Sequence, residues 1–264
     1  YLRLWSGQII SYSGDALTRV ALPLYVFQAT GDAIALGGMF AIQQLPWILF
    51  GSYAGVLADR LNRKRLLIAA ILLEASAVAA ISITVTLWPI FALAFVAATA
   101  QVIQSATRSA ATPDIVGARL YPRATAVSVT SVQLIDTAGA ALAGLVVALI
   151  GPRTSLWVDV LTFVANALLV ATVPFPQQRS SAGKSVRVFD DLKSGFQFIW
   201  ANASLKFLVL VMVSRGLTIV GIGPLLPVVI QADLGGGAIE FGLLSAATSL
   251  AFILASFGSI RLER

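Results

Sequence analysis

The sequence contains no cysteine and no histidine. Without cysteine the chain forms no disulfide and uses no thiolate, and without either residue the usual zinc sites are excluded. The missing imidazole also removes the commonest proton-transferring side chain. No nucleophile–base set, phosphate-binding loop or metal-ligand cluster is visible in the sequence. We therefore expect neither an enzyme nor a bound cofactor.

Charge is scarce as well. Asp, Glu, Lys and Arg make up 11% of the residues, whereas apolar residues make up 58% and the mean hydropathy is +0.89. A soluble domain is about one quarter charged, because charged side chains cover its surface. This composition predicts an all-α integral membrane protein, since helices satisfy their own backbone hydrogen bonds in lipid.

Apolar stretches long enough to cross a bilayer follow one another along the chain. The predicted helices cover 3–29, 34–58, 65–87, 90–112, 123–149, 154–174, 204–231 and 238–261. Short turns rich in helix breakers are expected between them. They fall at Gly31-Asp32, Trp88-Pro89, Gly151-Pro152-Arg153 and Gly235-Gly236-Gly237.

Cations gather in alternate turns of this arrangement. They fall in 60–65, 119–123, 179–193 and 261–264, whereas the intervening turns hold little beyond Arg153. Basic turns of membrane proteins stay in the cytoplasm. We therefore expect a bacterial inner-membrane protein with both ends of this sequence in the cytoplasm.

The net charge of +6 is interpreted as a consequence of this topology and not as a sign of nucleic-acid binding. Because the sequence starts at Tyr1 and not at Met, we expect residues to precede it.

An internal repeat appears when the chain is shifted by 204 residues. Ala21-Leu22-Pro23-Leu24 then aligns with Leu225-Leu226-Pro227-Val228, and Asp59-Arg60 aligns with Glu263-Arg264. The repeat predicts three parts. Residues 1–175 form a six-helix bundle, 176–203 form a cytoplasmic linker with a short amphipathic helix, and 204–264 form the first two helices of an incomplete second bundle.

Three charged residues in the first and fifth predicted helices are candidates for proton or substrate binding, because ionisable groups inside a membrane are rarely idle. Asp15 and Arg19 are four residues apart, so they share a helix face and are expected to pair. A structural ion pair is the alternative. Asp136 lies in the fifth helix, where desolvation favours the neutral, proton-carrying form of a carboxyl group. A hydrogen-bonded contact between helices is the alternative there.

Further charges in the spans receive different interpretations. Arg215 has no acidic residue on its own face of the seventh predicted helix, so it is a secondary candidate that needs a partner elsewhere. Glu74 is expected to pair with the basic turn at 60–65. Asp159 is expected to lie near the outer surface in contact with water.

A glycine and a basic hairpin lie between the second and third predicted helices. They comprise Gly55, Asp59, Arg60, Arg63, Lys64 and Arg65. Four cations in a segment this short cost too much in hydrocarbon, at about 2.5–3.5 kcal/mol each, so the hairpin must lie in water. Between spans two and three, this pattern resembles the hairpin motif of the major facilitator superfamily. Residues 14–23 and 113–116 resemble its drug, macrolide and siderophore efflux branch.

The resemblance implies two six-helix bundles, twelve helices in all, around a central cavity that opens alternately to each side. It also implies proton-coupled efflux of lipophilic drug-like or siderophore-like molecules. Asp59, Arg60 and Arg63 would be gating residues that hold one conformation until a proton or a substrate shifts the equilibrium.

Three features depart from the pattern of this superfamily. Gly139, Ala143 and Gly144 match its antiporter motif, but Ala140 replaces the central proline. The fourth helix carries Gln101 and Gln104 where many relatives carry an arginine, and Arg108 is expected nearer the cytoplasm. The last four of the twelve implied helices fall outside this sequence, as expected if it is a piece of a full-length transporter. A second hypothesis follows, in which the chain is a shortened, non-transporting subunit of a larger membrane complex and needs a partner to cover its incomplete bundle.

Overall fold

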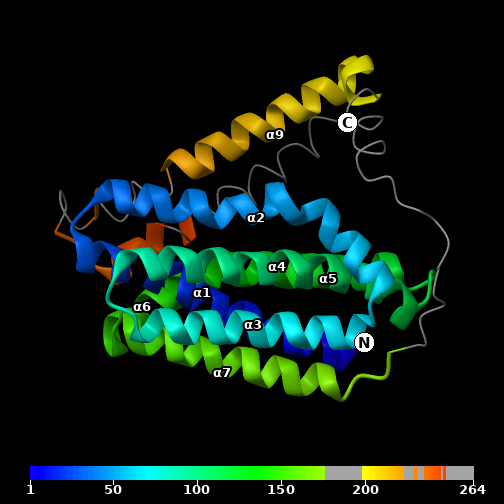
Figure 1. The fold of residues 1–264 in the computed structure, drawn as a ribbon, viewed down its shortest axis with the longest axis horizontal. Helices are drawn as coiled ribbons and strands as arrows, with labels where there is room; N and C mark the ends of the chain where they lie inside the picture. The colour runs from blue at the N-terminus through cyan, green and yellow to red at the C-terminus, as the bar shows by residue number, and fades with distance from the viewer. Residues whose placement is uncertain (176–197, 223–228, 231–234, 245, 248–264) are drawn as a thin grey trace.

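The computed structural model describes residues 1–264 except for 176–197, 223–228, 231–234, 245 and 248–264, and except for the side chains of 33, 212 and 215–222. The described part is helical (Figure 1). Its helices are α1 (Leu2–Thr30), α2 (Ala33–Arg60), α3 (Arg63–Ile83), α4 (Leu87–Val116), α5 (Tyr121–Leu134), the π-helix η1 (Ile135–Gly139), α6 (Ala140–Ile150), α7 (Pro152–Ala171) and α9 (Ala203–Ile222).

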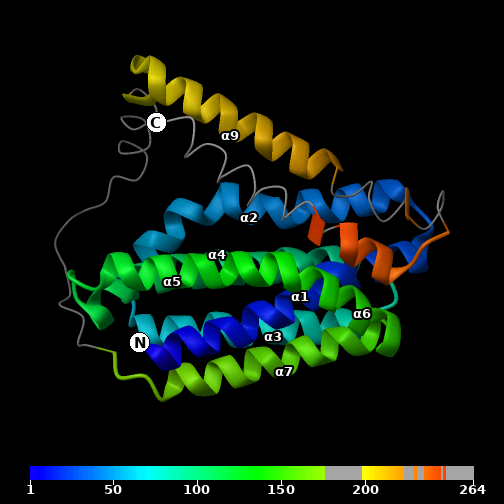
Figure 2. The same cartoon turned by 180° about the vertical axis from the view of Figure 1, so that it is seen from behind.

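The helices α1 to α7 run antiparallel in one bundle, in which α5, η1 and α6 make a single continuous span (Figures 1 and 2). We call the end with the turn between α2 and α3 the hairpin end, and the opposite one the far end. The N-terminus lies at the hairpin end. α1 packs mainly on α7, and α4 packs on both α2 and α3. Outside the bundle, α9 approaches α2 at the far end and diverges from it toward the hairpin end.

Five segments of the described residues are long and apolar enough to span a membrane. They are Ile34–Arg60, Arg63–Ile83, Leu87–Val116, Tyr121–Ile150 and Pro152–Ala171. The helix α1 is equally long and carries Asp15 and Arg19 near its middle. Large apolar side chains also face outward, Ile48 and Leu149 among them. The all-helical membrane fold expected from composition is therefore present.

Most turns at the far end lie at the helix-breaking residues that were predicted from the sequence. Gly31 takes a left-handed conformation with φ 63°, and the Asp32 side chain accepts from the Ile34 amide at 2.8 Å and so caps α2. Pro152 occupies the first turn of α7, where its missing N–H leaves no hydrogen bond unmade. The turn predicted at Trp88-Pro89 is wrong, because both residues lie in the first turn of α4, which tolerates proline for the same reason.

Some predictions concern residues outside the described part. The amphipathic helix expected in the linker falls almost entirely within 176–197, and the repeat of the hairpin motif falls within 259–264. The backbone of Arg215 belongs to α9, but its side chain lies outside the described residues.

Close contact between α1 and α7 depends on two glycines of α1. A Cβ atom added at Gly7 would lie 2.7 Å from the side-chain amide of Asn166, and one added at Gly14 would overlap Asp159 and Thr162. Small residues let membrane helices approach closely enough for such side chains to meet across the interface. Gly14 thus sets the distance at which α7 presents its polar residues to α1.

Replacing Gly14 by alanine should lower the stability of the bundle by about 1–3 kcal/mol, the typical cost of overpacking. Gly51 of α2 is the matched control, because a Cβ atom there meets nothing within 4 Å. Its replacement by alanine should leave stability unchanged or raise it slightly, since alanine is the better helix former. Thermal unfolding in detergent measures both. Equal effects at the two positions would contradict the close packing inferred at Gly14.

Candidate functional site

Charged side chains from five spans meet near the middle of the bundle. At 1.5 Å per residue, Asp15, Glu74, Asp136 and Asp159 lie between about 16 and 22 Å from the hairpin ends of their spans. These residues belong to α1, α3, η1 and α7, and Arg108 of α4 joins them. We call these five residues and Arg19 the central cluster. It lies where hydrocarbon surrounds the bundle, so each charge needs a partner within the protein.

An ion pair joins α1 to η1. The Arg19 Nη2 atom lies 2.8 Å from the Asp136 Oδ1 atom, and the two side chains are 50% and 31% exposed. The pair predicted between Asp15 and Arg19 is therefore wrong. Sharing a helix face brings the two groups near each other, but a carboxylate from the neighbouring span comes closer to the guanidinium. Asp15 remains within electrostatic range of Arg19, Arg108 and Asp136.

Arg108 joins the central cluster from its hairpin side, since at 1.5 Å per residue it lies about 12 Å from the end of α4 at Val116, nearer the hairpin end than the carboxyl groups, as its sequence position suggested. Its Nη2 atom donates to the Gln104 Oε1 atom at 3.4 Å. With the Asn166 amide nitrogen donating to the Gly7 carbonyl, the Asn166 oxygen accepts from the same Nη2 atom at 2.9 Å. The Nη1 atom is buried and has no hydrogen-bond partner among the described residues. The spacing of four between Gln104 and Arg108 is the sequence signal for this polar face.

Glu74 and Asp159 are both buried, which overturns the two predictions made for them. Glu74 is 2% exposed and accepts from the Gln104 Nε2 atom at 2.5 Å, so it does not pair with the hairpin. Asp159 is 0% exposed, and its carboxylate accepts hydrogen bonds from the Thr18 and Thr162 hydroxyls. Burial of α3 and α7 against their neighbours withdraws both carboxyl groups from water. The threonines gave no sequence signal beyond their polarity.

Arg63 is the centre of the basic hairpin. Its guanidinium donates to the backbone carbonyls of Ala58 (3.2 Å) and Ala110 (2.8 Å), and it binds the carboxylates of Asp59 (3.1 Å) and Asp114. The two carbonyls lie near the C-terminal ends of α2 and α4, where a cation is favoured by the helix dipole. Arg63 therefore ties the hairpin to α4.

The other hairpin residues differ in their surroundings. The Lys64 Nζ atom donates to the Val173 carbonyl at 3.0 Å, just after α7. Arg60 and Arg65 are exposed, and so is most of Asp59. A Cβ atom added at Gly55 would meet nothing within 4 Å, so this glycine borders open space on the described part of the structure. Asn62 caps α3 by accepting from the Arg65 amide at 3.0 Å.

The span that matches the antiporter motif is distorted without a proline. The π-helix η1 ends at Gly139, immediately before Ala140, and contains Asp136. Wide turns of this kind recur at functional sites, because they redirect a side chain within a helix. Beyond it, Ala143 is buried, and Gly144 lies against residues 238–242. A Cβ atom on Gly144 would lie 2.5 Å from the Ala238 carbonyl oxygen and 2.9 Å from the Gly242 Cα atom.

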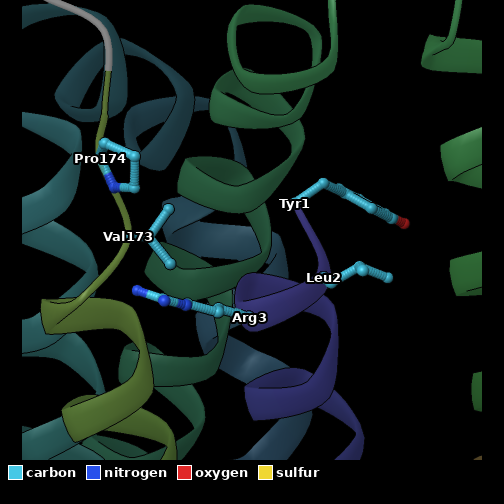
Figure 3. Close-up of a pocket in the computed structure, with 5 residues that line it drawn as sticks. All are labelled: Tyr1, Leu2, Arg3, Val173 and Pro174. Carbon is cyan, nitrogen blue, oxygen red and sulfur yellow. The ribbon is translucent and has the colours of Figure 1, made fainter.

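A pocket of about 490 Å³ lies apart from the central cluster, at the hairpin end. Tyr1, Leu2, Arg3, Val173 and Pro174 line it, and Figure 3 shows Arg3 directed toward Val173 and Pro174 while Tyr1 points away. None of these residues belongs to the central cluster. The pocket is therefore a feature of the surface where α1 begins and α7 has ended.

A basic hairpin between the second and third spans of a helical membrane bundle, with an ion pair at mid-depth, is consistent with a major facilitator fold. Comparison with known families agrees. The family described as transmembrane secretion effectors, part of the major facilitator superfamily, matches residues 1–264. The chain belongs to this family.

Two further comparisons concern individual proteins. Macrolide efflux protein A from Streptococcus pyogenes is 25% identical over 221 residues, which cover 80% of this chain and 54% of that protein. The chain thus spans about half the length of this relative. The crystal structure of the nucleoside transporter NupG (D323A mutant) matches with a TM-score of 0.72 and 14% identity, covering 96% of this chain and 64% of that one. This second likeness concerns the fold alone.

Proposed function

We propose that the chain is part of a proton-coupled efflux transporter for lipophilic small molecules, macrolide-like or siderophore-like compounds among them. The observation that carries the proposal is the central cluster. A buried guanidinium without a complete set of partners and several carboxyl groups lie together at mid-membrane, and such groups mark proton or substrate pathways. The likeness to a macrolide efflux protein supports the direction of transport and the substrate class.

Alternating access is supported by the placement of α9 and of residues 238–242. The contact between Gly144 and Gly242 brings the two parts of the chain together, whereas α2 and α9 diverge toward the hairpin end (Figure 1). We infer that this conformation opens toward the hairpin side. Asp59, Arg60 and Arg63 are proposed to stabilise the alternative conformation, in which the hairpin side is closed.

Topology and assembly extend the same proposal. The basic turns favour a bacterial inner membrane with the hairpin end in the cytoplasm. Residues 1–175 would be the first bundle, 176–203 the linker and 204–264 the beginning of the second bundle. The partner subunit suggested by the second hypothesis stays a prediction.

Asp15 is the proposed coupling residue, because it belongs to the central cluster and makes no ion pair within the described residues. Replacing Asp15 by asparagine should abolish efflux driven by a proton gradient, while exchange of substrate without a gradient persists. Everted membrane vesicles measure both reactions. The matched control is Asp32→Asn, since Asp32 is exposed and asparagine caps a helix equally well. Gradient-driven efflux at the wild-type rate in Asp15→Asn would contradict the proposed role.

A further inference from the structure

Glu74 has the least compensated environment of the buried carboxyl groups. The helix α3 packs against α4 and α7, and the charged groups that face Glu74 are Asp15 from α1, Arg108 from α4 and Asp159 from α7. The described residues place no cation within 4 Å of its carboxyl group. Its neighbours within hydrogen-bonding range are the amides of Gln101 and Gln104.

The number of charges around Arg108 makes full ionisation unfavourable. Arg19 and Asp136 neutralise each other. Asp15 and Glu74 then share the Arg108 guanidinium, and Asp159 has only the already paired Arg19 in electrostatic range, so two negative charges would remain in excess if all three were ionised. An isolated charge in such surroundings is very costly, and a carboxyl group there takes up a proton instead. At least one of the three must therefore be neutral.

The surroundings of the three groups indicate which one holds a proton. The ionised form of Asp159 is stabilised by hydroxyl donors from Thr18 and Thr162. Asp15 has two arginines in electrostatic range. The only hydrogen-bonding neighbours of Glu74 among the described residues are amides, and in its neutral form it can donate to an amide oxygen while still accepting from Gln104. Its environment therefore suits the neutral form best.

Glu74 is also connected to the rest of the central cluster. Gln104 donates to Glu74 through its nitrogen and accepts from Arg108 through its oxygen, so one amide bridges the carboxyl group and the guanidinium. The Nη1 atom of Arg108 is buried and lacks a hydrogen-bond partner among the described residues, so Arg108 has a donor to offer when a neighbouring carboxyl group ionises. Ionisation of Glu74 would draw Arg108 toward Gln104, and ionisation of Asp15 would compete for the same guanidinium.

We propose that Glu74 is a second proton-binding residue, which holds its proton in this conformation and competes with Asp15 for Arg108. Because both carboxyl groups interact with one arginine, protonation of each one changes the proton affinity of the other. The consequence of this coupling for transport rests on the proposed function. The proton comes from water and returns to water, and no other bond changes.

Infrared spectroscopy of the reconstituted protein tests the proposal directly. At neutral pH the wild type should show the carbonyl band of a protonated carboxyl group, and Glu74→Gln should lack it. The control Glu240→Gln should retain it, because Glu240 is exposed and accepts from the Gly237 amide, as glutamine also can. Should Glu74→Gln fail to fold, wild-type protein grown with carboxyl-labelled glutamate should show the same band displaced. An undisplaced band, or one unchanged in Glu74→Gln, would overturn the proposal.

A pH titration of the Glu74 carbonyl band tests the proposed competition for Arg108. In Asp15→Asn the guanidinium has one carboxyl competitor fewer and Glu74 one like charge fewer nearby. The pH at which the Glu74 band disappears should therefore fall by about one unit. An unchanged titration would show that the two residues are independent and would overturn this part. The spectra need neither substrate nor gradient, so their outcome is distinct from failure of proton-coupled efflux itself.

Discussion

Alanine at position 144 is expected to separate α6 from residues 238–242 and to shift the protein away from the conformation described above. The added Cβ atom would lie 2.5 Å from the Ala238 carbonyl oxygen and 2.9 Å from the Gly242 Cα atom. Both are backbone atoms, so no side-chain rotation relieves the overlap. A strain of about 1–3 kcal/mol changes a two-state population by about 5- to 150-fold.

The shift is measurable with spin labels, because the sequence has no native cysteine to interfere. Labels at Leu149→Cys and Ile239→Cys, both exposed positions, report the distance between the two parts of the chain. Gly144→Ala should lengthen it and Gly242→Ala should do the same, since a Cβ atom there would lie 2.6 Å from the Ala140 carbonyl oxygen. Gly51→Ala is the control. An unaltered distance distribution in both variants would contradict the close approach.

Removing one member of the Arg19–Asp136 pair is expected to harm the protein more than removing both. Arg19→Ala leaves a carboxylate at mid-membrane without its cation, and Asp136→Ala leaves the guanidinium without its anion. Unpaired charges of this kind are strongly destabilising, whereas loss of both partners is often nearly neutral. We expect each single variant to lose about 1–3 kcal/mol, below the cost for a fully buried pair because both side chains are partly exposed.

A double-mutant cycle on thermal stability in detergent measures the coupling between Arg19 and Asp136. The double variant Arg19→Ala with Asp136→Ala should recover most of the lost stability and should remain inactive in gradient-driven efflux. Additive losses would show that the two side chains do not interact. Full activity in the double variant would remove both residues from the transport mechanism.

The basic hairpin shows how much of a site can be predicted from the local sequence. Its cations cannot lie in hydrocarbon, so their place in a turn between two spans follows from composition alone. Which groups Arg63 binds does not follow. Its contacts with Ala110 and Asp114 come from α4, and only the packing of α2 beside α4 brings that helix end within reach.

The central cluster shows what local sequence does not predict, namely the contacts between different spans. A spacing of four correctly places Asp15 and Arg19 on one helix face, but it says nothing about neighbouring spans. Asp136 reaches Arg19 from η1, a wide helical turn that no proline marks. Asp159 and Glu74 are equally polar in the sequence whether a helix faces water, lipid or protein, so their burial was unpredictable from position alone.

The sequence by itself determined that this is a helical membrane protein, where its first six spans lie and which turn is basic. These properties follow from the bilayer, because its hydrocarbon core contains no water to bind backbone groups or charges. Tertiary structure alone decided which charges meet. The rotation of each helix about its own axis, and its distance from the next, are set by contacts such as those at Gly14 and Gly144, which join residues remote in the sequence.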